Sequence, residues 1–111
     1  LAGGVGADTY HFNYALNEAT NVDTITSFSS IDLIALSSSI FTKAGPAGTL
    51  AASAFRANTS GAAGDASDRI IYETDTGILR YDEDGTGAAA AIAFAVIGSK
   101  ASMNNADFVI V

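Results

Sequence analysis

The sequence predicts an all-β domain, and three observations support this fold class. Large apolar residues recur at every second position in several short runs, as in Tyr10, Phe12 and Tyr14. This period of two is typical of strands that bury one face. The runs are separated by turns rich in Gly and Asp, and the segments that favour helix are limited to single turns.

A glycine-rich turn opens the chain. From Gly3 the residues follow the pattern G-G-x-G-x-D-x-U-x, where U is a large apolar residue, which is the nonapeptide of calcium-binding parallel β-rolls. Glycines allow positive φ angles and bring backbone carbonyls close to a cation, and the Asp supplies a carboxylate. Ca²⁺, which takes six to eight oxygen ligands, suits such a turn. The pattern therefore predicts a calcium site at Gly3, Gly4, Gly6 and Asp8 in the last coils of a right-handed parallel β-roll, over residues 1–36.

The predicted roll extends in both directions from this turn. Leu1 lies nine residues before Tyr10, at the U position of a preceding repeat, so we expect further coils upstream. Downstream, the order apolar, Asp, x, Ile occurs at Val22–Ile25 and again nine residues later at Ile31–Ile34. Because such a step is one turn of the roll, we expect these two segments to form successive coils without the glycines.

The aspartates of these two segments, Asp23 and Asp32, have two interpretations. Either they add oxygen ligands to a calcium site, or they cap turns by accepting hydrogen bonds from backbone N–H groups. Both interpretations stay open for Asp23, which is a candidate ligand. The capping interpretation is favoured for Asp32.

Residues 37–67 are predicted to form short helical turns and loops. Ser37 to Phe41 favours one helical turn, and Gly45-Pro46-Ala47-Gly48 interrupts what precedes it. The run from Thr49 to Phe55 fits a short helix or turn that docks Leu50 and Phe55. The Gly, Ala and Ser-rich stretch from Asn58 to Ser67 predicts an exposed loop.

Residues 68–111 are predicted to form an antiparallel, sandwich-like layer. The β-rich runs Arg69–Glu73 and Ile78–Asp82 flank Thr74–Gly77, whose glycine suits a tight turn, so we expect a hairpin. A third strand follows, in which Ile92, Phe94 and Val96 alternate with alanines. Ser102 is expected to cap a last helical turn. A final strand from Phe108 to Val111 is expected to bury Phe108 and Ile110 on one face.

Composition and charge narrow the function classes. Twelve acidic against five basic residues give a net charge of −7, which argues against nucleic acid or an anionic membrane as a partner and suits a divalent cation. No cysteine is present, and no apolar run is long enough to cross a bilayer. The single histidine, His11, falls on the polar face of its strand and receives no role. A zinc site or a nucleophile–base pair needs more than this one imidazole, so we interpret the domain as not an enzyme.

A second acidic cluster invites comparison with an EF-hand loop. Asp82-Glu83-Asp84-Gly85 has alternating carboxylates and a glycine, but the twelfth position is Ala93 instead of glutamate, and the glycine comes two places early. A carboxylate-rich hairpin turn is therefore the favoured interpretation, and calcium binding there is left open.

In its whole length the chain resembles the C-terminal end of RTX proteins of the serralysin type, which bacteria export through type I systems. The matching segments occur in family order and are the nonapeptide, Asn21–Phe28 with Asp32–Leu36, Asp68–Tyr72, Thr76–Gly85 and Ala106–Val111. One departure is Ser27, where the family often has a carboxylate.

This resemblance implies a calcium-dependent capping, folding and export module at the end of a larger secreted protein, whose upstream part can be an enzyme such as a metalloprotease. Its partners would be Ca²⁺, the upstream RTX repeats and the type I secretion machinery. The terminal Asp107, Phe108, Val109, Ile110 and Val111 look like the uncleaved secretion signal. The alternative is a module that binds carbohydrate or a cell surface, since related ends occur in adhesins, although the sequence contains no Trp.

Overall fold

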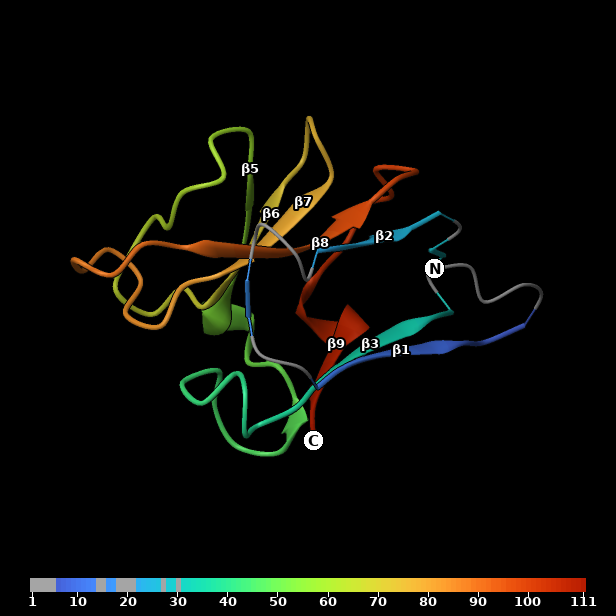
Figure 1. Ribbon diagram of the computed structural model, residues 1–111, viewed down its shortest axis with the longest axis horizontal. Coiled ribbons are helices and arrows are strands. Elements are labelled where there is room, and N and C mark those ends of the chain that lie inside the picture. Colours follow the sequence, from blue (N-terminus) through green and yellow to red (C-terminus); the bar gives the residue numbers. More distant parts are fainter. Residues whose placement is uncertain (1–5, 14–15, 18–21, 27, 30) are drawn as a thin grey trace.

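The computed structural model describes residues 6–13, 16–17, 22–26, 28–29 and 31–111, and all structural statements below concern these residues. They form two mixed β-sheets (Figure 1). The four-stranded sheet has the order β1 (Thr9–Phe12), β3 (Leu33–Leu36), β9 (Phe108–Ile110), β4 (Gly48–Thr49). The five-stranded sheet has the order β2 (Asp23–Ile25), β8 (Ile92–Ile97), β7 (Ile78–Tyr81), β6 (Ile70–Glu73), β5 (Phe55–Asn58). The helices of the described residues are two short 3-10 turns, η1 (Ala52–Ala54) and η2 (Asn105–Asp107), so the mostly-β class is confirmed.

The first three strands alternate between the sheets. β1 belongs to the four-stranded sheet, β2 to the five-stranded sheet, and β3 returns to lie parallel to β1, with Thr9 opposite Leu33. The expectation that the segments of Asp23 and Asp32 stack as neighbouring coils is therefore wrong. A step of nine residues carries the chain across from one sheet to the other, and the parallel neighbour of β3 lies 24 residues earlier in the chain.

The core lies between the two sheets and contains a chain of aromatic rings. Phe12 of β1 meets Phe94 of β8 edge-on with 5.3 Å between ring centroids, and Phe41 meets Phe94 at 5.0 Å and Tyr81 at 5.2 Å. Edge-to-face pairs of this kind stabilise beyond the area that they bury. They join the parallel part of the fold to the antiparallel part, so the two predicted regions share one core.

The predicted meander is confirmed. β6, β7 and β8 pair antiparallel in sequence order, and the β6–β7 turn is closed by the N–H of Gly77, which donates to the carbonyl of Glu73 at 2.8 Å. An irregularity in the β7–β8 pairing at Leu79 and Arg80 breaks the predicted alternation in β8. Phe94 and its neighbour Ala95 are both buried as a result.

The middle of the chain contains two strands that the sequence pattern did not predict, namely β4, which pairs with β9, and β5. β5 pairs parallel with β6 and lies at the edge of the five-stranded sheet. Its residues, Phe-Arg-Ala-Asn, show no clear alternation of apolar and polar side chains. The docking of Leu50 next to a short helical turn is confirmed, because Leu50 is buried and η1 follows directly. The N–H of Phe41 donates to the carbonyl of Ser37 at 2.8 Å, which is the predicted helical turn.

The C-terminal strand is confirmed, but its sheet differs from the prediction. β9 is not part of the antiparallel layer: it lies between β3 and β4 in the other sheet, parallel to β3 and antiparallel to β4. Phe108 and Ile110 are buried on one face, as expected. The helical turn before β9 is capped by Asn104 instead of Ser102, because the side chain of Asn104 accepts the N–H of Ala106 at 2.8 Å.

One kind of turn precedes three of the strands. Three buried aspartates each accept, at Oδ2, the main-chain N–H of the residue three positions earlier, and each lies directly before a strand or two residues before it. The pairs are Asp32 with Ser29 (2.9 Å), Asp68 with Asp65 (3.2 Å) and Asp107 with Asn104 (2.8 Å), ahead of β3, β6 and β9. A buried carboxylate in this position satisfies N–H groups that the turn leaves unpaired. The capping interpretation of Asp32 is thereby confirmed.

Candidate metal centre

Asp8 lies directly before β1 and is tied to the turn before β3. Its main-chain N–H donates to Oδ1 of Asp32 at 2.9 Å, and its carbonyl accepts the N–H of Leu33 at 2.8 Å. Gly6 has a φ of +91°, and a Cβ built there would meet nothing within 4 Å. The turn therefore requires glycine at this position for its backbone conformation, since there is room for a side chain. Gly3 and Gly4 lie outside the described residues.

The carboxylate of Asp8 contains a buried oxygen that lacks a hydrogen-bond partner. Oδ2 is inaccessible to solvent, and no group in the described part of the chain donates to it. A buried carboxylate oxygen with neither water nor a donor costs free energy, so such atoms in native proteins call for an explanation. A bound cation is one explanation, and a hard oxygen ligand is what Ca²⁺ takes.

Asp23, the other predicted acidic ligand, is the first residue of β2. This strand is the edge of the five-stranded sheet, whereas Asp8 lies at the edge of the four-stranded sheet. The two residues thus belong to opposite sheets, and no group of three or more His, Cys, Asp or Glu side chains gathers anywhere in the described ranges. Of the predicted ligands other than Asp23, the backbone carbonyls of the glycine turn remain as companions of Asp8.

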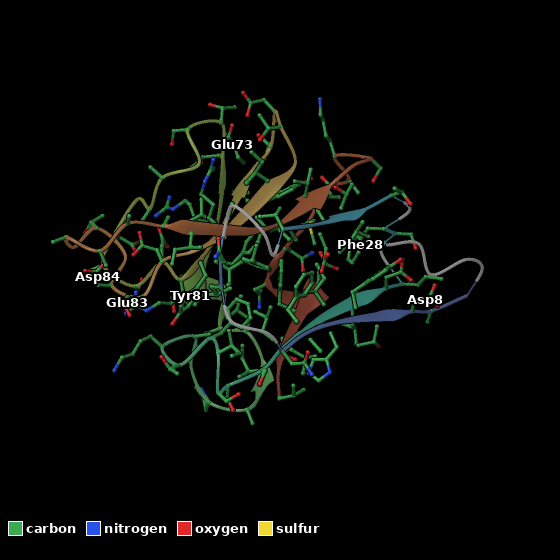
Figure 2. The ribbon with its side chains drawn as sticks, in the orientation of Figure 1. Asp8, Phe28, Glu73, Tyr81, Glu83 and Asp84 are labelled. Atoms are coloured by element: carbon green, nitrogen blue, oxygen red, sulfur yellow. The ribbon has the colours of Figure 1, made fainter. Side chains whose placement is uncertain are left out.

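Asp82 and Asp84 form a second pair of carboxylates, and Asp84 lies toward the opposite end of the long axis from Asp8 (Figure 2). Asp82 is buried, and its Oδ1 accepts the N–H of Asp84 at 3.2 Å. Oδ2 of Asp84 accepts the N–H of Ala89 at 3.0 Å, whereas its Oδ1 is buried and has no donor among the described residues. These bonds support the interpretation as a turn closed by its own side chains.

The two carboxyl groups of this turn have opposite pKa shifts. Burial, followed by the neighbouring carboxyl group of Asp84, raises the pKa of Asp82. The pKa of Asp84 is lowered, chiefly because its carboxylate accepts the N–H of Ala89. The raised pKa means that Asp82 holds a proton more readily than an ordinary aspartic acid, and this proton can be donated to the neighbouring carboxylate of Asp84.

Ion pairs on the five-stranded sheet were not singled out from the sequence. Nε of Arg56 on β5 donates to Oδ2 of the buried Asp68 at 2.8 Å, and the same oxygen accepts the N–H of Gly64 at 2.7 Å. On β7, Nη1 of Arg80 donates to Oε1 of Glu73 on β6 at 2.6 Å. The first of these pairs attaches the loop after β5 to the sheet, which is a structural role.

The predicted export segment is largely hidden in the folded chain. Asp107, Phe108 and Ile110 are buried, Val109 is half-buried, and Val111 is half exposed. Asp107 also completes a capping box, since its Oδ2 accepts the N–H of Asn104 at 2.8 Å. In the native fold these residues serve as a turn and a core strand.

The surface of the described residues forms no pocket. No helix among them has the length and apolar character needed to cross a membrane. Comparison of the chain with family models, with curated proteins and with solved structures yields no match in any of the three. The resemblance to RTX proteins therefore depends on the quoted sequence segments.

Proposed function

We propose that this chain is the calcium-binding capping, folding and secretion-signal domain at the C-terminal end of a larger secreted RTX protein. The observation that carries the proposal is Oδ2 of Asp8, which is buried and has no hydrogen-bond donor among the described residues, two positions after Gly6 with its positive φ. A carboxylate oxygen in this state is suited to a cation, and the carbonyls of the Gly3 to Asp8 turn would supply the remaining hard ligands.

The path of the first three strands supports a roll-like N-terminal part. The chain passes from β1 in one sheet to β2 in the other and back to β3, parallel to β1, as one coil of a roll would do. β1 and β2 are both edge strands and lie on the same side of the molecule (Figure 1). A preceding RTX coil could pair with both edges at once, and stacked coils need such neighbours to cover unpaired strand edges. The rest of the fold would then act as the cap of the roll.

Calcium would make the folding of this cap depend on whether the chain is inside or outside the cell. A site with one carboxylate and several carbonyls is expected to be weak and to fill at the millimolar Ca²⁺ concentrations found outside cells. In a cytosol poor in free Ca²⁺ the glycine turn would lack the ion that offsets its ordering cost. The chain would therefore leave the cell unfolded and fold after export.

Calorimetric titration with Ca²⁺ tests the site. The wild-type chain should take up calcium, and Asp8→Ala should lose most of this uptake. Asp75→Ala is the matched control, because it removes one exposed aspartate carboxylate in the β6–β7 turn, outside both acidic candidate sites, and should leave calcium uptake unchanged. Equal uptake by wild type and Asp8→Ala would refute the assignment of Asp8 as a ligand.

Secretion through a type I system tests the signal. A full parent chain without Phe108 to Val111 should not be exported. Because this deletion also removes a core strand, Ile34→Ala serves as the control: it weakens the same sheet at a fully buried position and leaves the terminus intact. Export of the Ile34→Ala chain but not of the truncated chain supports a signal, whereas normal export of the truncated chain contradicts it.

A further inference from the structure

The last strand of the chain fills a gap between two strands that do not pair with each other. β9 forms a parallel ladder with β3 and an antiparallel ladder with β4, with Leu36 and Gly48 both opposite Ile110. Three bonds extend these ladders: the N–H of Val111 donates to Leu36 at 3.0 Å, that of Ser38 to Val111 at 2.8 Å, and that of Leu50 to Phe108 at 3.1 Å. Without the final residues, β4 would therefore have no partner in this sheet, and β3 would pair with β1 alone.

The same residues complete the core on the inner face of this sheet. Phe108 and Ile110 are 0% and 1% exposed, and the ring of Phe108 lies 5.5 Å from that of Phe55 on the opposite sheet. Just before β9, Nδ2 of Asn105 donates to the carbonyl of Leu50 at 2.8 Å. Without this segment, β3 and β4 would expose backbone groups as two new edges, and the core would lose a fully buried ring.

We propose that the gap between β3 and β4 is a strand-binding slot, and that any receptor holding residues 107–111 in extended form prevents the chain from folding. The backbone groups and inward side chains of β9 can contact either the slot or a receptor, but not both at the same time. Each N–H and C=O group that pairs with a receptor strand is no longer free to pair with β3 or β4. Folding and recognition of the terminus are then mutually exclusive, and this exclusion does not require calcium.

The inference deepens the proposed export function and rests on it only for the identity of the receptor, which would be the type I exporter. An exporter bound to the terminal segment would withhold a central strand of the four-stranded sheet. The chain would be kept unfolded by the machinery that recognises it and would fold when the segment is released. Calcium binding at Asp8, directly before the edge strand β1 of the same sheet, would be a second control on folding.

Refolding of the full chain tests the slot directly. The chain is unfolded in urea and diluted into buffer that contains about 5 mM Ca²⁺, near the extracellular level, and a saturating Fab raised against an Ala106–Val111 peptide. We expect the half-time of refolding, followed by hydrogen exchange of the backbone amides of the chain, to lengthen at least about tenfold. A Fab against the exposed turn Gly98–Lys100 is the control and should leave the half-time unchanged. Refolding at the control rate with the terminal Fab still bound would overturn the proposal.

A pair of full-chain variants gives an independent readout. Phe108→Asp with Ile110→Asp places charge on the inward face of β9, and we expect it to abolish the cooperative unfolding transition. Val109→Asp with Val111→Asp places the same charges on the outward face and should keep a cooperative transition. Native-like unfolding of the inward variant would overturn the slot. Neither experiment contains an exporter, so a failure of the slot and a failure of the export function are distinguishable.

Discussion

The main-chain N–H of Asp8 donates a hydrogen bond to Oδ1 of Asp32 across 24 residues of sequence, with 2.9 Å between the two atoms. The carboxylate before β3 thereby organises the turn before β1. Its Oδ2 accepts a second N–H, from Ser29 at 2.9 Å. The two turns at this end of the four-stranded sheet consequently form one hydrogen-bonded unit that contains the candidate calcium ligand.

Replacing Asp32 with alanine is expected to weaken both turns. The N–H groups of Asp8 and Ser29 would lose their acceptor, and unpaired N–H groups cost more than the lost bond itself. We expect the urea midpoint to fall, and calcium uptake at Asp8 to fall with it because the turn is no longer held. Asp75→Ala, which removes an exposed carboxylate outside both acidic candidate sites, controls for the change in net charge. An unchanged midpoint and unchanged calcium uptake would show that the turn before β1 is fixed by other contacts.

Asp82 should make the stability of the chain depend on pH. Its pKa is raised by burial and by Asp84, so the folded state favours the protonated form. The stabilisation is present below the ordinary Asp pKa of about 4 and is lost as the pH rises through the raised value. Asp82→Asn supplies a neutral side chain that can still donate to Asp84. We expect this variant to unfold at higher urea than wild type at pH 8 and to match it near pH 4.

Asp84 and Asp32 contribute the opposite slope, because their pKa values are lowered and their stabilisation is lost as the pH falls. For this reason the Asp82 effect is measured as the difference between variant and wild type at each pH. A difference that stays constant between pH 4 and pH 8 would contradict the assignment.

The two acidic partners of Arg56, Asp68 and Asp65, should contribute unequally to the stability of the fold. Asp68 has a side chain 2% exposed and lies 2.8 Å from Nε, whereas Asp65 is 54% exposed and lies 3.2 Å from Nη2. Removing one partner of a fully buried pair costs roughly 3–5 kcal/mol, and the partial exposure of Arg56 lowers our expectation for Asp68→Ala to about 2 kcal/mol. Loss of the Arg56 pair in Asp65→Ala should matter much less, because exposed pairs are screened by water. Urea unfolding measures the loss of stability in both variants. Equal losses would show that the burial of Asp68 does not decide how much its ion pair contributes to stability.

Gly77 is expected to tolerate substitution less well than Gly45. Its φ is +81°, and a Cβ would lie 2.2 Å from the carbonyl oxygen of Ile97, which belongs to the backbone of β8. Gly77→Ala should therefore combine backbone strain with a clash and cost about 2–4 kcal/mol. Gly45 has a φ of +121° and open space around it, so a substitution there causes backbone strain without a clash. Gly45→Ala should therefore cost only about 1–2 kcal/mol. Thermal unfolding measures both, and an equal loss would mean that the clash relaxes without cost.

The sequence by itself determined the local features of this fold. The period of two located β1, β-rich runs around a glycine turn located the β6–β7 hairpin, and an apolar run located the terminal strand. These patterns also assign Tyr10, Phe12, Phe108 and Ile110 to the interior, where they lie. Local chemistry also predicted the positive φ of Gly6 and Gly77. These features depend on residues close together in the chain, so a sequence pattern can specify them.

Only the tertiary structure decided which sheet each strand joins. Alternation shows which face of a strand is buried but does not identify the strand that pairs with it. The sequence therefore predicted neither the sheets that β2 and β9 join nor the polar strand β5. The same limit applies to the candidate site. The glycine turn and Asp8 could be predicted, whereas the bond from Asp8 to Asp32 and the burial of Asp82 follow from how the two sheets pack. Contacts between residues far apart in the chain exist only once the shared core brings their strands together.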